Sequence, residues 1–181
     1  MVGFYLVMLF LVGCNAPKAT STPIPPSQTP IPATSAPDGK PVEFSQELPA
    51  ITKQIKYSVD GMDLKTSNGQ ALYFLRGWSF ISEDPNQSTY ERLIVLQSDT
   101  KTYFFPSERY NRPGVQETYK ALNMDLLNSG FHTYISPDVI EPGTYHIGIL
   151  FINQSSNALY YKVTNKMITR TDHQLQLGLQ P

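Results

Sequence analysis

The sequence predicts an all-β fold, an antiparallel β-sandwich with one short helix, preceded by a disordered Pro/Ser/Thr-rich linker. Between residues 43 and 170, runs of alternating apolar and polar residues are separated by turn-forming residues, as in sandwiches of many short strands. Only one stretch has the 3.6-residue period of a helix. The chain has 1 cysteine, so no disulfide can form within it and the domain depends on its hydrophobic core.

Residues 1–13 form a short apolar segment that ends directly before Cys14. Between Phe4 and Leu11 the segment has no charged residue, but it is too short to cross a hydrocarbon core of about 30 Å. Its length fits the apolar region of a signal peptide, and Gly13 supplies the small side chain that a signal peptidase requires. An apolar N-terminal strand with an unmodified cysteine is the alternative.

The sequence Leu-Val-Gly-Cys at residues 11–14 resembles the lipobox of bacterial lipoproteins. The resemblance implies that residues 1–13 are a lipoprotein signal peptide and that cleavage precedes Cys14. It also implies that the Cys14 thiol carries a diacylglycerol, with a further acyl chain such as palmitate on the new amino terminus. A single acyl chain binds a membrane only reversibly, with a constant of about 10⁴ M⁻¹, whereas two or more anchor stably. The resemblance therefore predicts a protein held by lipid on the extracytoplasmic face of a cell membrane.

Residues 14–42 are predicted to be a disordered linker between Cys14 and the folded domain. Their prolines alternate with Ser, Thr and Ala, and such a composition buries too little apolar surface to offset the entropy of ordering. The prolines are Pro17, Pro23, Pro25, Pro26, Pro30, Pro32, Pro37 and Pro41. Because proline favours extended backbone, we expect a semi-rigid tether.

The charge of the chain excludes one class of partner. The net charge is −1 and charged residues make up 16%, with no basic block, whereas nucleic-acid binding requires a basic surface. The expected partners are the membrane, through the lipid, and an envelope polysaccharide or a membrane protein.

The first predicted strands are 51–59 and 62–66. The first is expected to turn back at Asp60-Gly61 and the second at Asn68-Gly69, because both pairs favour the type I′ turns of two-residue hairpins.

Residues 71–81 are apolar on both faces, which predicts a central strand of a two-layer structure. Within it, Trp78 beside Arg76 is interpreted as a core anchor with a cation–π neighbour. Residues 90–97 and 101–105 flank a polar turn and are predicted to form another hairpin.

One short helix is predicted around Val115, Tyr119 and Leu122, which are spaced i, i+4, i+7. Pro113 lies at its first turn, where the missing N–H costs little. We expect this helix to cross between the two sheets.

The last predicted strands are 131–135, 144–152, 158–163 and 166–170. The strand at 144–152 has the clearest period-2 alternation. Residues 171–181 are predicted to be a C-terminal tail outside the β-sandwich domain at 43–170.

A second resemblance, over about residues 70–165, is to an immunoglobulin-like β-sandwich module of bacterial cell-envelope proteins. The segments that carry it are Gly77-Trp78-Ser79-Phe80, Tyr103-Phe104-Phe105, Arg112-Pro113-Gly114-Val115, Gly130-Phe131 and Gly143-Thr144-Tyr145. The family pattern has an acidic residue where this chain has Gly114. The resemblance implies no catalytic residues.

The titratable residues predict no catalytic, cofactor or metal site. The histidines are scattered along the chain, whereas a zinc site needs three or four converging ligands. The close carboxylate pairs lie in predicted loops beside Pro, Ser and Asn, where solvated turn formers are expected. These residues are His132, His146, His173, Glu83, Asp84, Asp138 and Glu141.

Tyr160 and Tyr161 are the best candidates for a ligand or partner contact, because one of two adjacent rings in a strand must face outward. The predicted function is a lipid-anchored protein that displays a β-sandwich binding or scaffolding module. Two alternatives remain open: an envelope hydrolase, indicated by a deep pocket holding Asp138, Glu141 or His132, and an accessory subunit of a membrane complex, indicated by a large exposed apolar patch.

Overall fold

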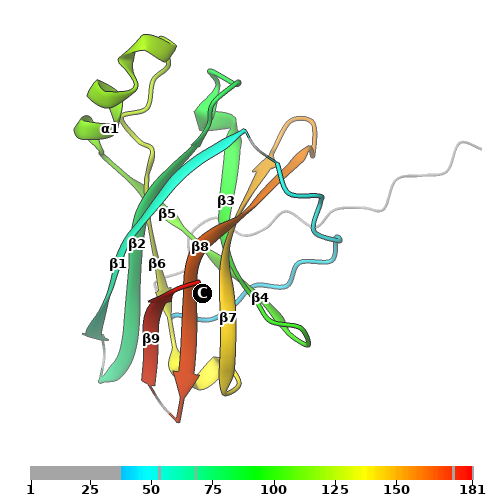
Figure 1. The fold of residues 1–181 in the computed structure, drawn as a ribbon, viewed down its shortest axis with the longest axis vertical. Helices are drawn as coiled ribbons and strands as arrows, with labels where there is room; N and C mark the ends of the chain where they lie inside the picture. The colour runs from blue at the N-terminus through cyan, green and yellow to red at the C-terminus, as the bar shows by residue number, and fades with distance from the viewer. Residues whose placement is uncertain (1–37, 53, 68, 173, 181) are drawn as a thin grey trace, which may run out of the picture. The chain divides into compact units, whose positions relative to one another are not determined.

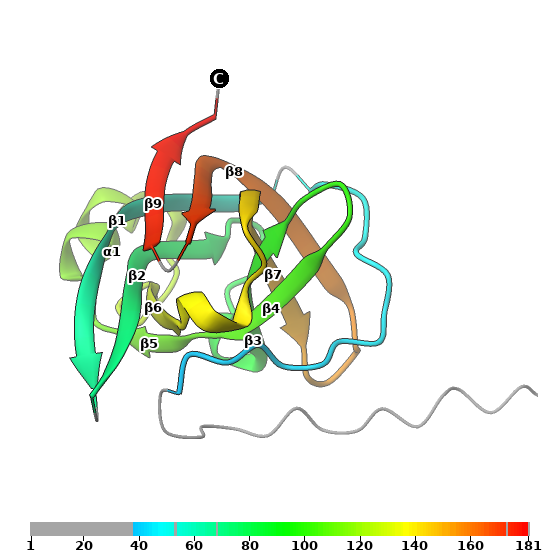
Figure 2. The same ribbon diagram turned by 90° about the horizontal axis from the view of Figure 1, so that it is seen from below.

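A computed structural model describes residues 38–52, 54–67, 69–172 and 174–180. The signal peptide, Cys14 and most of the linker predicted at 14–42 therefore lie outside the described residues. The described part consists of two antiparallel sheets that pack face to face (Figures 1 and 2). Among the described residues, no helix combines the length and the hydrophobicity that a membrane crossing requires.

The four-stranded sheet has the order β1-β2-β6-β5. Its strands are β1 (Ile55–Ser67), β2 (Gln70–Ile81), β6 (Gly130–Ile135) and β5 (Glu108–Tyr110). The five-stranded sheet has the order β4-β3-β7-β8-β9. Its strands are β4 (Thr102–Pro106), β3 (Tyr90–Gln97), β7 (Gly143–Asn153), β8 (Leu159–Thr171) and β9 (Gln174–Leu179).

This strand order confirms the predicted immunoglobulin-like sandwich. Strands β1-β2-β6-β5 correspond to the A-B-E-D sheet of an immunoglobulin domain, and β3-β7-β8 correspond to its C-F-G sheet. Strand β4 extends the second sheet beside β3, and β9 extends it beyond β8.

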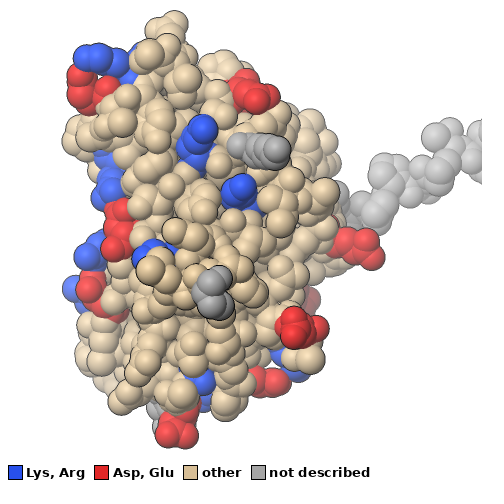
Figure 3. Space-filling view, in the orientation of Figure 1, with Lys and Arg blue, Asp and Glu red and all other residues tan. Residues whose placement is uncertain are grey.

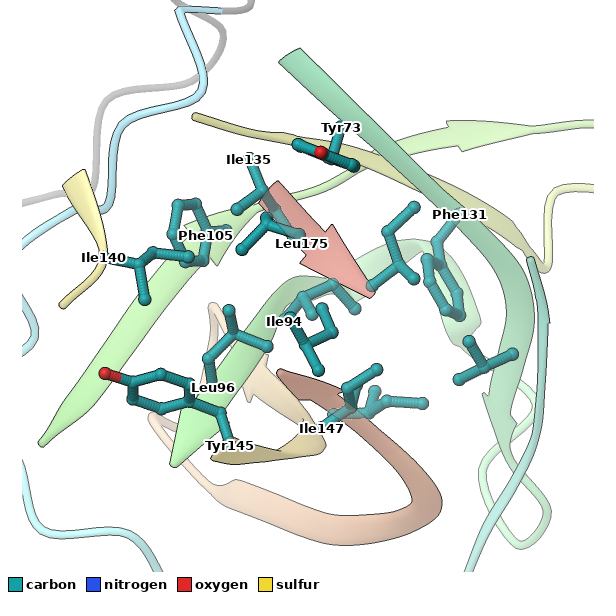
Figure 4. Close-up of a cluster of buried hydrophobic side chains, with 14 of the residues drawn as sticks. Tyr73, Ile94, Leu96, Phe105, Phe131, Ile135, Ile140, Tyr145, Ile147 and Leu175 are labelled. Carbon is teal, nitrogen blue, oxygen red and sulfur yellow. The ribbon is translucent and has the colours of Figure 1, made fainter. Parts of the chain in front are cut away.

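Apolar side chains from both sheets form the main core (Figure 4). Tyr73 and Phe131 of the four-stranded sheet face Ile94, Phe105 and Ile147 of the five-stranded sheet. All five are buried, so the alternation seen in the sequence corresponds to the inward face of each strand.

The Asp60-Gly61 hairpin prediction is wrong. Strand β1 continues through this pair to Ser67, with a register shift between Val59 and Gly61 where it pairs with β2. An Asp-Gly pair accommodates a β-bulge as readily as a turn, and here the long partner strand keeps both halves of β1 paired. The turn predicted at Asn68-Gly69 does join β1 to β2, since Ser67 pairs with Gln70; Asn68 itself lies outside the described residues.

The predicted helix is present, but its expected crossing between the sheets is wrong. Helix α1 (Pro113–Thr118) and a 3₁₀ turn at Lys120–Leu122 connect β5 to β6. These two strands are hydrogen-bonded neighbours in the same sheet, so the connection returns to the sheet that it left.

The domain boundary predicted at residue 170 is also wrong. Residues 174–179 form β9, which pairs with β8, and Leu175 is 5% exposed in the main core. The separate strands predicted at 158–163 and 166–170 are one strand, β8, with a register shift where it pairs with β7. At the N-terminal side the packed chain begins before residue 43: the Ser136 amide donates to the Gly39 carbonyl at 2.9 Å.

Candidate functional site

Tyr160 and Tyr161 do not form an exposed contact patch. Tyr161 is only 3% exposed, and burial raises its pKa to about 12. Its hydroxyl donates to the Gln97 side chain at 3.0 Å. Tyr160 is half-buried and packs edge-on against Tyr90, with ring centroids 5.8 Å apart.

Tyr161 does lie on the outward face of its sheet, as one ring of the pair must, but an N-terminal segment covers that face. Residues 42–52 run along the five-stranded sheet, where the Val42 amide donates to the Phe104 carbonyl at 2.7 Å and the Thr52 amide donates to the Tyr161 carbonyl at 2.8 Å. Val42, Phe44 and Leu48 pack against the second cluster of buried residues, which contains Tyr161. The covered face is therefore part of the core.

The cavities near Trp78 and Ser129 are not lined by any of the carboxylates and histidines considered for catalysis. Glu141 pairs with Lys101 at 3.0 Å on an exposed corner, and the ion pair raises the Lys101 pKa. His132 pairs with Glu108 at 3.1 Å on the outer face of the four-stranded sheet. Asp84 accepts a hydrogen bond from the Tyr90 hydroxyl.

His146 is half-buried on β7, and its Nδ1 has no hydrogen-bond partner among the described residues. His173 lies outside the described residues. Within the part of the chain that the structure describes, no group of three or more His, Cys, Asp or Glu side chains could hold a metal ion.

The outer face of the four-stranded sheet carries a cluster of rings that we call the aromatic face: Phe74, Trp78, Tyr110, His132 and Tyr134. The register places Phe74 of β2 opposite Tyr134 of β6, and His132 two residues from Tyr134 on the same face. All five side chains are half-buried, so each keeps some contact with solvent.

Four rings of the aromatic face, those of Tyr134, Phe74, His132 and Tyr110, touch one another in a row across three strands. The Phe74 centroid lies 5.0 Å from His132 and 5.2 Å from Tyr134, and His132 lies 5.9 Å from Tyr110. These are ordinary separations for favourable tilted ring pairs, which hold one another in place. The row is therefore a preformed surface of rings.

Ion pairs border this row. Arg76 of β2 pairs with Asp63 of β1, and Arg112 pairs with Asp60 at 2.5 Å. The Lys65 ammonium lies 5.9 Å from the Phe74 ring centroid. In Figure 3, side chains of both signs alternate along the margin where β1 runs in Figure 1. The border thus offers paired donors and acceptors with little net charge.

The expected cation–π contact between Arg76 and Trp78 is replaced by the Arg76–Asp63 ion pair. Trp78 instead stacks on Phe80 at 5.9 Å and packs against Tyr119 of the β5–β6 connection at 5.7 Å. Trp78 and Tyr119, with Arg112 and Pro113, line an open hollow of about 540 Å³. This hollow is at the end of the aromatic face nearest α1.

Sequence reasoning overlooked the aromatic face although its signal was present. Phe74 and Trp78 share one face of a strand by period 2, as do His132 and Tyr134. The strand at 71–81 was apolar on both sides, so the sequence alone did not show which side another layer would cover.

Comparison with known proteins yields no match: no protein-family model, no curated protein and no solved structure matches this chain.

Proposed function

We propose that this protein is a lipid-anchored extracytoplasmic lipoprotein whose β-sandwich binds a glycan of the bacterial cell envelope through the aromatic face. The observation that carries the proposal is the row of Tyr134, Phe74, His132 and Tyr110, whose rings are in contact and half-exposed. Rings held in this way offer a large contact area at a small entropic cost.

The chemistry of the border favours a sugar chain over an apolar or strongly charged partner. Sugars present C–H groups that pack on rings and hydroxyls that both donate and accept hydrogen bonds. The ion pairs Arg76–Asp63 and His132–Glu108 supply donors and acceptors beside the rings. The border carries charges of both signs, so the face has no general attraction for polyanions.

The two alternative functions have less support. The carboxylates considered for hydrolysis, Glu83, Asp84, Asp138 and Glu141, line neither the hollow at Trp78 nor the cavity near Ser129. Large exposed apolar side chains are present, but they are spread over several elements rather than gathered on one surface. They are Ile51, Leu64, Leu122, Leu127 and Leu179.

The proposed anchor rests on the sequence at residues 11–14, which resembles a lipobox. In this proposal residues 1–13 are removed, Cys14 carries the lipid, and the proline-rich linker holds the sandwich away from the membrane. The linker has about 24 residues before the described chain begins, and an extended polyproline chain rises about 3.1 Å per residue. That length lets the domain reach envelope polymers while it stays attached.

Replacing Cys14 with alanine should release the protein from the membrane. Diacylglycerol is attached through the thiol, so alanine removes the attachment point. After fractionation of cells, the wild-type protein should sediment with membranes and mass spectrometry should show a lipid on Cys14. An unmodified Cys14, or a variant that still sediments with membranes, would contradict the anchor.

Removing two rings of the aromatic face should abolish most of the glycan binding. In Phe74→Ala/Tyr134→Ala, we expect affinity for isolated cell-wall sacculi to fall by about tenfold or more, since a buried aromatic anchor commonly contributes about 2 kcal/mol. The measurement is co-sedimentation of the full chain in detergent with sacculi.

Ile51→Ala/Leu179→Ala is the matched control, because both side chains are apolar and exposed but belong to other surfaces. It should bind like wild type. Equal binding by the aromatic variant would refute the proposal, as would capture of a membrane protein through this face with no binding to sacculi.

A further inference from the structure

A second, smaller cavity lies at one end of the sandwich, between the loop after β2 and the loop before β6. Its volume is about 170 Å³, enough for about five waters at about 30 Å³ each. Most of the residues that line it are polar, and they include Ser79, Ser88, Arg109, Asp125, Asn128 and Ser129. The cavity lies apart from the open hollow at Trp78, with which it shares no lining residue.

Arg109 is the cation that lines this cavity. Its Nη2 donates to the carbonyls of Gln87 at 2.7 Å and Tyr90 at 2.5 Å, which fixes the guanidinium in place. Within the described part of the chain, its Nη1 and Nε make no hydrogen bond. Arg109 is half-buried, and this burial lowers its pKa. A fixed guanidinium with unused donors is suited to an oxyanion.

A second cation, Arg92, lies behind the cavity wall. It is 3% exposed and donates to Ser79 and Ser129, both of which line the cavity. Burial, and then the nearby charge of Arg109, lower the Arg92 pKa to about 9, so the guanidinium stays charged at neutral pH. Neither arginine forms an ion pair with a carboxylate of the described residues. The region therefore has two positive charges that no carboxylate of the described residues pairs with directly.

Ser129 supplies an independent sign of a missing ligand. The residue is 4% exposed and lines the cavity, yet its hydroxyl has no hydrogen-bond partner among the described residues. Buried hydroxyls almost always have a partner, because an unsatisfied one costs free energy. A ligand that accepts a hydrogen bond would satisfy this group.

We propose that this cavity binds an oxyanion group, a carboxylate or a phosphate, which accepts hydrogen bonds from the Arg109 guanidinium and the Ser129 hydroxyl. The anion neutralises the charge of the two arginines in a partly desolvated site. This site is separate from the aromatic face and does not depend on the proposed function.

Asp125 also lines the cavity, and its negative charge should weaken the binding of an anion there. Removing this charge therefore tests the proposal. The Asp125 carboxylate is exposed and accepts the Leu127 amide at 3.1 Å. Asp125→Asn keeps an oxygen for that hydrogen bond and removes a like charge. The proposal therefore expects the variant to bind anions more tightly than the wild type.

The test is titration of the full chain in detergent with sodium phosphate and, separately, sodium acetate, at an ionic strength held constant with sodium chloride. Backbone amide shifts report binding. We expect saturable shifts at the lining residues for at least one of the two anions, and the tighter one identifies the source of the oxyanion group. Arg109→Gln should bind at least about tenfold more weakly, as expected for a lost charged hydrogen bond. Lys56→Gln, which makes the same change in net charge at an exposed position of β1, should bind like wild type.

Ser129→Ala is a second variant that should fold at least as stably as the wild type, so weaker anion binding in this variant could not be attributed to misfolding. Without anion it should raise the melting temperature, because it removes an unsatisfied buried hydroxyl, while anion binding becomes about three- to tenfold weaker. Shifts that chloride reproduces, or unchanged binding in both Arg109→Gln and Ser129→Ala, would overturn the proposal. Phe74→Ala/Tyr134→Ala should keep the anion affinity of the wild type. Failure of the glycan proposal can therefore be distinguished from failure of the anion proposal.

Discussion

Replacing Arg92 with alanine should lower the free energy of unfolding by about 3–5 kcal/mol, the cost of truncating a large, fully packed side chain and leaving its partners unsatisfied. Arg92 of β3 donates to the carbonyls of Ser79 at 3.2 Å, Ser129 at 3.0 Å and Gly130 at 2.7 Å. One side chain therefore ties the five-stranded sheet to β2 and β6 of the other sheet.

The aliphatic and planar parts of Arg92 also contribute to packing. Its guanidinium lies 5.2 Å from the Phe131 ring centroid and 5.8 Å from the Phe151 ring centroid. Arg92→Met keeps much of this volume but leaves the carbonyl acceptors without a donor, so it should also destabilise, by less than Arg92→Ala. Urea unfolding followed by circular dichroism gives both values. A methionine variant as stable as wild type would show that the hydrogen bonds add nothing.

Replacing Gly77 with alanine should destabilise the domain by about 3 kcal/mol or more, at the upper end of overpacking effects. A Cβ at this position of β2 would lie 2.1 Å from the Ser58 carbonyl oxygen and 2.7 Å from the Phe131 ring. The first of these atoms belongs to the backbone of the neighbouring strand, so relief requires β1 to move. The same urea unfolding measures the loss.

Gly114→Ala is the matched control for Gly77→Ala. A Cβ on Gly114 of α1 would have no heavy atom within 4 Å, and alanine is favoured over glycine in helices. We expect this variant to be as stable as wild type or slightly more stable. Equal stabilities for the two alanine variants would contradict the packing described for Gly77.

Most strands could be predicted because their patterns are local. The strands at 90–97 and 131–135 agree with the structure to within one residue, since apolar runs and flanking turn residues define their ends. The errors arise where pairing with another strand determines where a strand ends. Asp60-Gly61 forms a bulge because β2 pairs with both halves of β1, whereas the local Asp-Gly signal favours a turn.

The C-terminal strand β9 was not predicted for the same reason, because its formation depends on pairing with another strand. Leu175 and Leu177 alternate with polar residues, but the run is short and polar overall. It becomes a strand because β8 offers an unpaired edge, and because Leu175 reaches the core. Residues 174–179 therefore form a strand because of tertiary contacts rather than because of propensity.

The candidate site could be predicted only in part. Sequence reasoning expected recognition through surface aromatic rings, and it placed the contact at Tyr160 and Tyr161. Whether an outward ring is exposed depends on what covers its sheet. Val42, Phe44 and Leu48 cover the five-stranded sheet, while the aromatic face on the other sheet stays half-exposed.

The buried cations are another feature that the sequence did not reveal. The residues directly after Arg92 in its strand are apolar, so the sequence does not show which face of the strand Arg92 lies on. Its role depends on carbonyls of β2 and of the loop before β6, which are far from it along the chain.

The most direct test of glycan recognition is a map of amide chemical-shift changes in the full chain, in detergent, on titration with soluble cell-wall oligosaccharides. Recognition by the aromatic face predicts that the largest changes fall on β2 and β6, around Phe74, Arg76, His132 and Tyr134. Changes centred on the five-stranded sheet, or none at saturating sugar, would contradict it.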